Sequence, residues 1–160
     1  MLSVTIIAVG KLKEKFYKEA IEEYKKRLSA FCGFEIIEVK DERTPENPTE
    51  TEKQQLLKKE GERIIAKIPK NSKVITLCIE GKEMPSEDLA KLISEFSVLG
   101  QSHITFIIGG SMGLSEEVKA LSCLRLSFSK MTFPHMLMRV ILAEQLYRAF
   151  TIIEGKTYHK

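Results

Sequence analysis

Residues 103–113 read HITFIIGGSMG, and this stretch decides the class of fold. Its first six residues are mostly apolar with no alternation, so a strand built from them would be buried on both faces. Residues 73–79, KVITLCI, show the same pattern. Strands of this kind are typical of parallel sheets that helices cover on both sides. The glycines at 109, 110 and 113 then mark the turn out of a buried strand.

Strand-like and helix-like segments alternate along the whole chain. Apolar, β-branched runs predict strands at 3–9, 34–39, 73–79, 103–108 and 124–128. Apolar side chains at helical spacing predict helices at 13–31, 50–68, 86–97 and 135–150, with a short helix from Ser115. This alternation predicts a single α/β domain over residues 1–160, a mainly parallel sheet flanked by helices.

Composition narrows the class of protein further. The chain has 160 residues, 43% hydrophobic and 29% charged, which is typical of one globular domain. No apolar run approaches the ~20 residues of a membrane span, and the N-terminus lacks the features of a signal peptide, so we expect a cytoplasmic protein. Its three cysteines and three histidines are widely spaced, which predicts neither disulfides nor a metal site.

Charge is distributed unevenly along the chain. Residues 118–160 carry seven basic and two acidic side chains, although the whole protein has a net charge of only +3. A basic C-terminal third suits a polyanionic partner such as a nucleic acid. The alternative is an ordinary solvated face, which is the more common meaning of a modest charge excess.

The predicted helix at 135–150 differs from the others in being apolar around most of its circumference. Such a helix must be covered on nearly all sides, and a domain of this size covers one face of a helix easily but not every face. We therefore predict a homodimer that buries this helix. The alternative is a helix that is wholly internal to one chain.

Residues 108–115, IGGSMGLS, are the first candidate ligand-binding motif. Glycines after a strand allow backbone to approach a ligand closely, and ligands of open parallel sheets bind beyond the carboxyl ends of strands. The alternative is a tight turn without a ligand. The motif is not a dinucleotide fingerprint, because the G-x-G-x-x-G spacing and the ribose-binding acid are missing, and the chain has no P-loop.

Residues 126–135, LSFSKMTFPH, form the second candidate motif. Backbone groups of this hydroxyl-rich loop could hydrogen-bond an adenine edge, while Met131 and Phe133 could wall a flat base. The alternative is an ordinary loop that leads into the last helix.

Polar residues on and after the last helix form the third candidate set. They are His135, Arg139, Arg148, Tyr158, His159 and Lys160. A stacking ring, an imidazole and cations are groups that proteins use to hold an RNA base and its phosphate. The alternatives are an intrahelical Glu144–Arg148 ion pair and a frayed C-terminus.

Taken in order, the segments FIIGGSMGLS at 106–115, LSFSKMTFPHMLM at 126–138, EQLYRAF at 144–150 and YHK at 158–160 resemble the RlmH branch of the SPOUT methyltransferases. The resemblance covers essentially the whole chain. It implies a deep trefoil knot in the C-terminal part, with a cofactor-binding region at about 73–155 and a substrate-side tail at 152–160. It also implies a homodimer that uses S-adenosylmethionine to methylate N3 of a pseudouridine in 23S ribosomal RNA of the assembled ribosome.

The resemblance further implies residue roles. It places cofactor contacts on Leu77, Gly109, Gly110, Phe128, Ser129, Lys130, Met131, Thr132 and Phe133. It places catalytic, substrate-side groups on His135, Arg148, Tyr158 and His159. Two residues depart from the pattern of many relatives: Cys78 stands where an acid is common, and Lys160 where arginine is common.

Three other functions compete with this one. A non-enzymatic RNA-binding dimer would use the glycines only to build a turn. A SPOUT-like enzyme could instead methylate a transfer-RNA ribose. A nicotinamide oxidoreductase is disfavoured by the missing ribose-binding acid.

Overall fold

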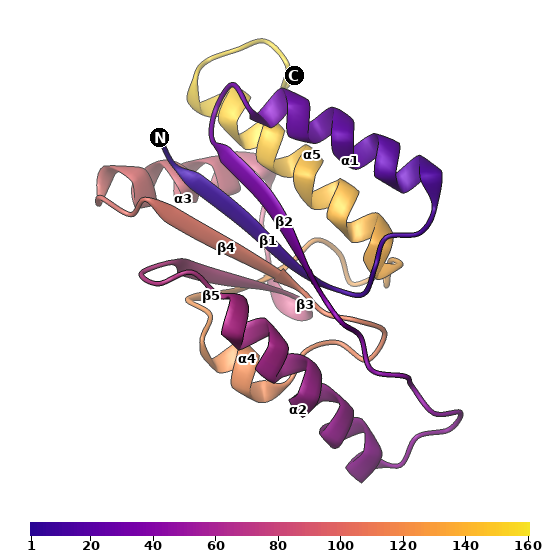
Figure 1. Cartoon of the computed structure of the whole chain (residues 1–160). Helices are drawn as coiled ribbons and strands as arrows, with labels where there is room; N and C mark the ends of the chain where they lie inside the picture. The colour runs from indigo at the N-terminus through magenta and orange to yellow at the C-terminus, as the bar shows by residue number, and fades with distance from the viewer.

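A computed structural model describes all residues, 1–160, as a five-stranded sheet between two layers of helices (Figure 1). The strands are β1 (Ser3–Val9), β2 (Gly33–Val39), β3 (Lys73–Glu83), β4 (His103–Ile108) and β5 (Leu124–Ser127). The helices are α1 (Lys15–Leu28), α2 (Glu50–Lys67), α3 (Ser86–Val98), α4 (Glu116–Ala120) and α5 (His135–Ile153). The strand order is β2-β1-β4-β3-β5, and every pairing is parallel. The predicted α/β class is confirmed.

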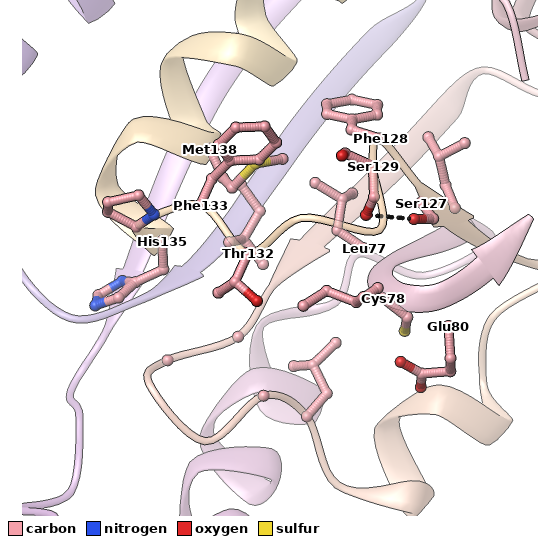
Figure 2. Close-up of a pocket in the computed structure, with 18 of the residues that line it drawn as sticks. Leu77, Cys78, Glu80, Ser127, Phe128, Ser129, Thr132, Phe133, His135 and Met138 are labelled. Atoms are coloured by element: carbon pink, nitrogen blue, oxygen red, sulfur yellow. Dashed lines mark hydrogen bonds between the residues drawn. The ribbon is translucent and has the colours of Figure 1, made fainter. Parts of the chain in front are cut away.

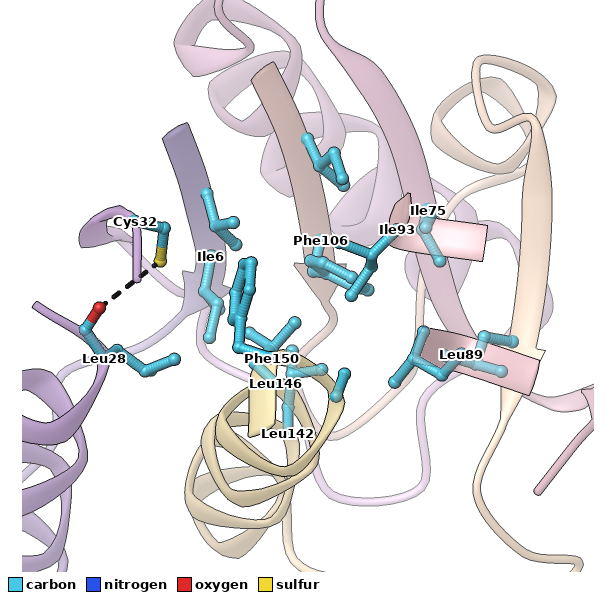
Figure 3. Close-up of a cluster of buried hydrophobic side chains, with 14 of the residues drawn as sticks. Ile6, Leu28, Cys32, Ile75, Leu89, Ile93, Phe106, Leu142, Leu146 and Phe150 are labelled. Carbon is cyan, nitrogen blue, oxygen red and sulfur yellow. Dashed lines mark hydrogen bonds between the residues drawn. The ribbon is translucent and has the colours of Figure 1, made fainter. Parts of the chain in front are cut away.

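Alternate side chains of the central strands point to opposite helix layers, as a strand's two-residue period requires. On one face, Ile6 of β1 and Phe106 of β4 pack against α1, α3 and α5 (Figure 3). On the other face, Ile7 and Ile107 pack against α2 and α4. These four side chains are fully buried, so β1 and β4 form the centre of the core.

β3 extends four residues beyond its predicted end at Ile79, and this extension matters for the site. Its pairing with β5 shifts register between Leu77 and Lys82. Gly81 allows the irregularity, because a Cβ there would lie only 2.6 Å from the carbonyl oxygen of Arg125. The extension carries Glu80, together with Cys78 just before it, to the sheet edge where β4 also ends.

α5 is only partly internal. Its inner face buries Leu142, Leu146 and Phe150 in the core, whereas Leu137 and Ile141 on the outer face remain half-exposed. A wholly internal helix is therefore wrong, and a single chain leaves an apolar strip of α5 only partly covered. The knot implied by the resemblance stays a prediction, because strand order and pairing do not test how the chain is threaded. No helix combines the length and apolar character needed to cross a membrane.

Candidate ligand pocket and C-terminal network

Three segments that are distant in sequence surround a cavity of about 560 Å³ at the carboxyl edge of the sheet (Figure 2). They are the end of β3, the glycine turn after β4, and the loop between β5 and α5. Figure 2 shows Leu77, Cys78 and Glu80 on one side, with Ser129 near Leu77, and Thr132, Phe133 and His135 on the other. Carboxyl ends of parallel strands are where such sheets bind ligands.

The glycine turn forms one wall with bare backbone. Gly113 donates its N–H to the carbonyl of Gly110 over 3.1 Å, and these two residues also form an isolated antiparallel bridge. A Cβ on Gly109 would overlap the carbonyl group of Gly113, and Gly113 itself has a φ of +83°. Glycine is thus required by close packing at the first position and by backbone conformation at the other.

Behind this turn lies Glu60 of α2, which sequence reasoning missed. Its side chain is 4% exposed; Oε2 accepts the N–H of Glu42 over 2.9 Å, while Oε1 has no partner. Burial raises the pKa of this carboxyl above its ordinary value. A Cβ on Gly110 would lie 3.5 Å from Oε1 and 3.2 Å from Val9, so the turn has little room to move backward. Because Glu60 sits in a charged stretch of helix, nothing in its local sequence distinguishes it from a surface residue.

The loop between β5 and α5 is held by its own hydroxyl groups. Ser127 Oγ donates to the carbonyl of Ser129 over 3.1 Å, and Ser129 Oγ accepts the N–H of Met131 over 3.0 Å. Phe128 and Phe133 stand half-buried on the cavity wall, while Met131 is 74% exposed. The loop therefore supplies apolar walls and nearby backbone groups, with Phe128 taking the place beside Phe133 that was predicted for Met131.

Nearly all residues assigned to the cofactor by resemblance meet at this cavity. Those that line it are Leu77, Gly109, Gly110, Phe128, Ser129, Met131, Thr132 and Phe133. Lys130 is exposed and does not line it, although its two neighbours do. His135 from the proposed catalytic set also lies on the cavity wall.

An acid that the sequence reading overlooked also lines the cavity. Glu80 Oε1 lies 2.7 Å from Nζ of Lys119, and that hydrogen bond lowers the pKa of the carboxyl. Cys78 also lines the cavity but is largely buried, and its Sγ donates to the hydroxyl of Thr76 over 3.6 Å. The carboxylate missing at Cys78 is thus present two residues later. Glu80 was missed because the strand was predicted to end at Ile79, which made Glu80 look like a loop residue.

His135 combines partial burial with an unused acceptor position. Its Nδ1 is buried and has no hydrogen-bond partner. Burial lowers the pKa of the imidazole, the Arg139 cation lowers it further, and Asp41 opposes both. The ring is therefore neutral near pH 7 and able to accept a proton.

Arg139 has a structural role, which corrects its assignment to an RNA-contacting set. It is 1% exposed, and its guanidinium lies 2.5 Å from Oε2 of Glu38 and donates to the carbonyl of Gly10 over 2.7 Å. It also donates to the carbonyl of Val9 over 3.2 Å. Arg139 thus ties α5 to the ends of β1 and β2 and is not accessible to a nucleic acid.

The remaining polar residues form a second network at the other end of α5. Arg148 donates to Glu144 over 2.8 Å, and Tyr158 donates to the same carboxylate oxygen over 2.7 Å. His159 bridges Arg148 at 3.1 Å and Glu87 at 2.7 Å. The intrahelical ion pair is confirmed and a frayed tail is wrong, because the last residues are held by these contacts. The exposed Lys160 makes no ion pair.

The two polar groups do not meet within one chain. His135 begins α5 and Arg148 lies near its end, which separates them by about 20 Å along the helix axis. The structure therefore brings His135 to the cavity and leaves Arg148, Tyr158 and His159 away from it.

Comparison with known proteins agrees with this architecture. A family model described as a predicted SPOUT methyltransferase matches residues 2–159. A solved structure, described as a probable methylase family protein from Haemophilus influenzae, aligns with a TM-score of 0.56 over all of this chain and 72% of that one, at 14% identity. The fold and the family match define an α/β methyltransferase of the SPOUT class.

Relatives with higher sequence identity place the chain in one family within the SPOUT class. A Methanococcus maripaludis protein called putative ribosomal RNA large subunit methyltransferase H is 58% identical over 159 residues, covering 99% of this chain and 100% of the relative. A Carboxydothermus hydrogenoformans protein called ribosomal RNA large subunit methyltransferase H is 55% identical with the same coverage. The chain belongs to the family of ribosomal RNA large subunit methyltransferases H.

Proposed function

We propose that this protein transfers the methyl group of S-adenosylmethionine to N3 of a pseudouridine in 23S ribosomal RNA, acting on assembled ribosomes. The observation that carries the proposal is the convergence of the glycine turn, the loop at 128–133 and His135 around one cavity. The names and identity of the relatives support a ribosomal RNA substrate.

The cavity fits S-adenosylmethionine in size and chemistry. About 560 Å³ lies within the range of small-molecule sites. Gly109 and Gly110 present bare backbone to the cavity, and Phe128 and Phe133 offer apolar walls for a flat base. Glu80 and its ion-pair partner Lys119 add one polar, charged corner to this wall. When bound, the cofactor supplies a methyl group made electrophilic by a sulfonium, and the protein has to exclude water and orient the acceptor nitrogen.

The decisive experiment incubates the purified protein and labelled S-adenosylmethionine with 70S ribosomes, naked 23S RNA and transfer RNA. We expect label in 23S RNA from ribosomes, at a pseudouridine identified by nucleoside mass spectrometry. Label in transfer-RNA ribose would favour the alternative SPOUT activity. A protein that binds RNA but gives no calorimetric heat with the cofactor would be a non-enzymatic RNA-binding dimer.

The imide N3–H of pseudouridine must lose its proton, and His135 and His159 are the candidate bases. We expect His135→Ala, His159→Ala or both to lower turnover by about 10²–10⁴-fold, the usual contribution of a positioned base. If His135 is the base, wild-type turnover rises with pH through a value below 6.5, because its lowered pKa sets the neutral fraction. Turnover across pH 5–9 measures this. If His135→Ala and His159→Ala both kept the wild-type dependence of turnover on pH, the proton would be released to water instead.

The separation of the two polar groups supports a shared site in a homodimer. In one chain the tail lies about 20 Å along α5 from its own cavity, while the outer strip of α5 is apolar and half-exposed. A partner whose tail reached this cavity would bring Arg148, Tyr158 and His159 to the substrate. There Arg148 would stabilise the anionic base and Tyr158 would stack on it.

Mixed dimers test this arrangement directly. If His135 is the base, His135→Ala and Tyr158→Ala chains are each expected to be nearly inactive alone. In an equimolar mixture one site in the heterodimer joins an intact cavity to an intact tail, so activity should return to about one quarter of wild type. Native mass spectrometry confirms that heterodimers form. No recovery in their presence would contradict sharing.

A further inference from the structure

A basic and aromatic surface lies beside the cavity and plays no part in the function described so far. It is formed by Lys11, Lys13, Lys15, Phe16 and Lys18, and we refer to it as the Lys11–Lys18 patch. All five side chains are exposed, and Phe16 is 63% exposed. The patch thus presents one exposed aromatic ring among four exposed lysine side chains.

Phe16 is held in place by a neighbour that is itself anchored. Its ring centroid lies 4.2 Å from that of Tyr17, with the two planes tilted by 50°. Tyr17 packs with Met136 and Val140 of α5 in a small apolar cluster. An exposed ring on a fixed support loses little conformational freedom when a flat group stacks on it.

Two exposed acids, Glu14 and Glu19, lie among these lysines, but only one ion pair forms. Lys15 lies 3.7 Å from Glu19, but both side chains are largely exposed, so the pair contributes little. Lys11, Lys13 and Lys18 form no ion pair. Lysines at the start of α1 also oppose the helix dipole, whereas α2 and α3 carry acids in their first turns. The charge of the patch thus does not stabilise the fold, and it complements an anion.

The chain leading into the patch touches the cavity rim. A Cβ on Gly10 would lie 3.6 Å from the ring of His135 and 3.4 Å from Met136. Leu12 is fixed as well, since its N–H donates to Glu38 over 2.8 Å. The patch is therefore attached to a rigid part of the site and borders the candidate base.

We propose that the Lys11–Lys18 patch binds an unpaired stretch of the substrate RNA next to the target nucleotide. Phe16 stacks on a flanking base, and Lys11, Lys13 and Lys18 neutralise phosphates. Exposed rings set among cations are how proteins hold single-stranded nucleic acid without reading its sequence. The proposal rests on the proposed function for its substrate but makes no use of the cofactor.

Binding of a fluorescent twelve-nucleotide uridine RNA, followed by anisotropy at several salt concentrations, tests the patch. We expect the triple variant Lys11→Gln/Lys13→Gln/Lys18→Gln to raise the Kd at least about tenfold and to reduce the salt slope by about 2, since each phosphate contact contributes ~0.7. Phe16→Ala should raise the Kd about tenfold and leave the salt slope unchanged. The matched control, Lys58→Gln/Lys67→Gln/Lys70→Gln, removes three exposed lysines in and just after α2 and should bind within twofold of wild type.

Two further measurements separate this proposal from its alternatives. Calorimetric affinity for S-adenosylmethionine should be the same in all variants. If the wild-type protein does not bind the cofactor, the proposed function fails, but the RNA titrations still test whether the Lys11–Lys18 patch binds RNA. Sedimentation equilibrium follows self-association: if Phe16→Ala weakens the dimer and leaves RNA affinity intact, the patch is an interface between copies of the chain. Unchanged RNA affinity in both patch variants would also overturn the proposal.

Discussion

Gly109→Ala is expected to lower affinity for S-adenosylmethionine by at least about 100-fold. A Cβ at this position would overlap the carbonyl group of Gly113, and it would lie 3.1 Å from the side chain of Leu114. The turn would have to open to relieve the overlap, and it cannot retreat far because Val9 and Glu60 lie behind Gly110. A displaced wall loses the close backbone approach on which the cavity depends. Isothermal titration calorimetry measures the loss.

Two other glycines provide matched controls for Gly109→Ala. Gly113→Ala meets no atom within 4 Å but must adopt a φ of +83°, so it should strain the turn by about 1 kcal/mol and weaken binding less. Gly33→Ala in β2 places its Cβ 3.5 Å from Ser3 Oγ, an ordinary contact, and should bind as wild type does. Thermal melts identify any variant that has unfolded. Affinity for S-adenosylmethionine should therefore be highest for Gly33→Ala, intermediate for Gly113→Ala and lowest for Gly109→Ala. Any other order would show that close packing at Gly109 does not shape the cavity.

Arg139→Met is expected to lower the free energy of unfolding by about 3 kcal/mol, because removing one partner of a buried ion pair leaves the other unpaired. Glu38 would lose its cation, and the carbonyls of Val9 and Gly10 would lose their donor. Glu38 is 37% exposed, so water compensates part of the loss and the effect stays at the low end of the usual range. Chemical denaturation monitored by circular dichroism measures the change.

A second substitution makes the origin of that loss testable. Arg139→Met/Glu38→Gln should recover about 1 kcal/mol or more, because the neutral amide no longer needs a cation and its oxygen can still accept the N–H of Leu12. Arg125→Met removes an exposed arginine whose nearest carboxylate lies 4.0 Å away, and it should cost less than about 1 kcal/mol. If the double variant were no more stable than Arg139→Met, the ion pair would not be the source of the effect.

The cavity was largely predictable because each of its walls is local in sequence. The glycines follow a buried strand, and the loop at 128–133 precedes a helix, so both patterns could be recognised without knowing where the other lay. The predicted end of β3 was wrong because Glu80, Gly81 and Lys82 lack the apolar, β-branched pattern of a strand. Only the irregular pairing with β5 keeps them extended. Glu80 was missed for that reason.

The last helix shows the limit of local reasoning. The spacing of His135 and Arg139 places both on one side of α5, and the sequence suggested that both face a substrate. In the structure Arg139 is buried against Val9, Gly10 and Glu38, whereas His135, one turn earlier, reaches the cavity. Sequence spacing determines the side of a helix on which a residue lies. What packs against that side depends here on segments more than a hundred residues away in the chain.

The sequence alone determined the parallel α/β class, the glycine turn and the hydroxyl-rich loop, because hydrophobic period and turn chemistry act over a few residues. Only the tertiary structure decided that these segments share one cavity, that Arg139 is internal, and that Tyr158 and His159 fold back onto the end of α5. The shared cavity and the burial of Arg139 depend on the order in which the parallel strands pair, because that order brings together residues that are far apart in the sequence.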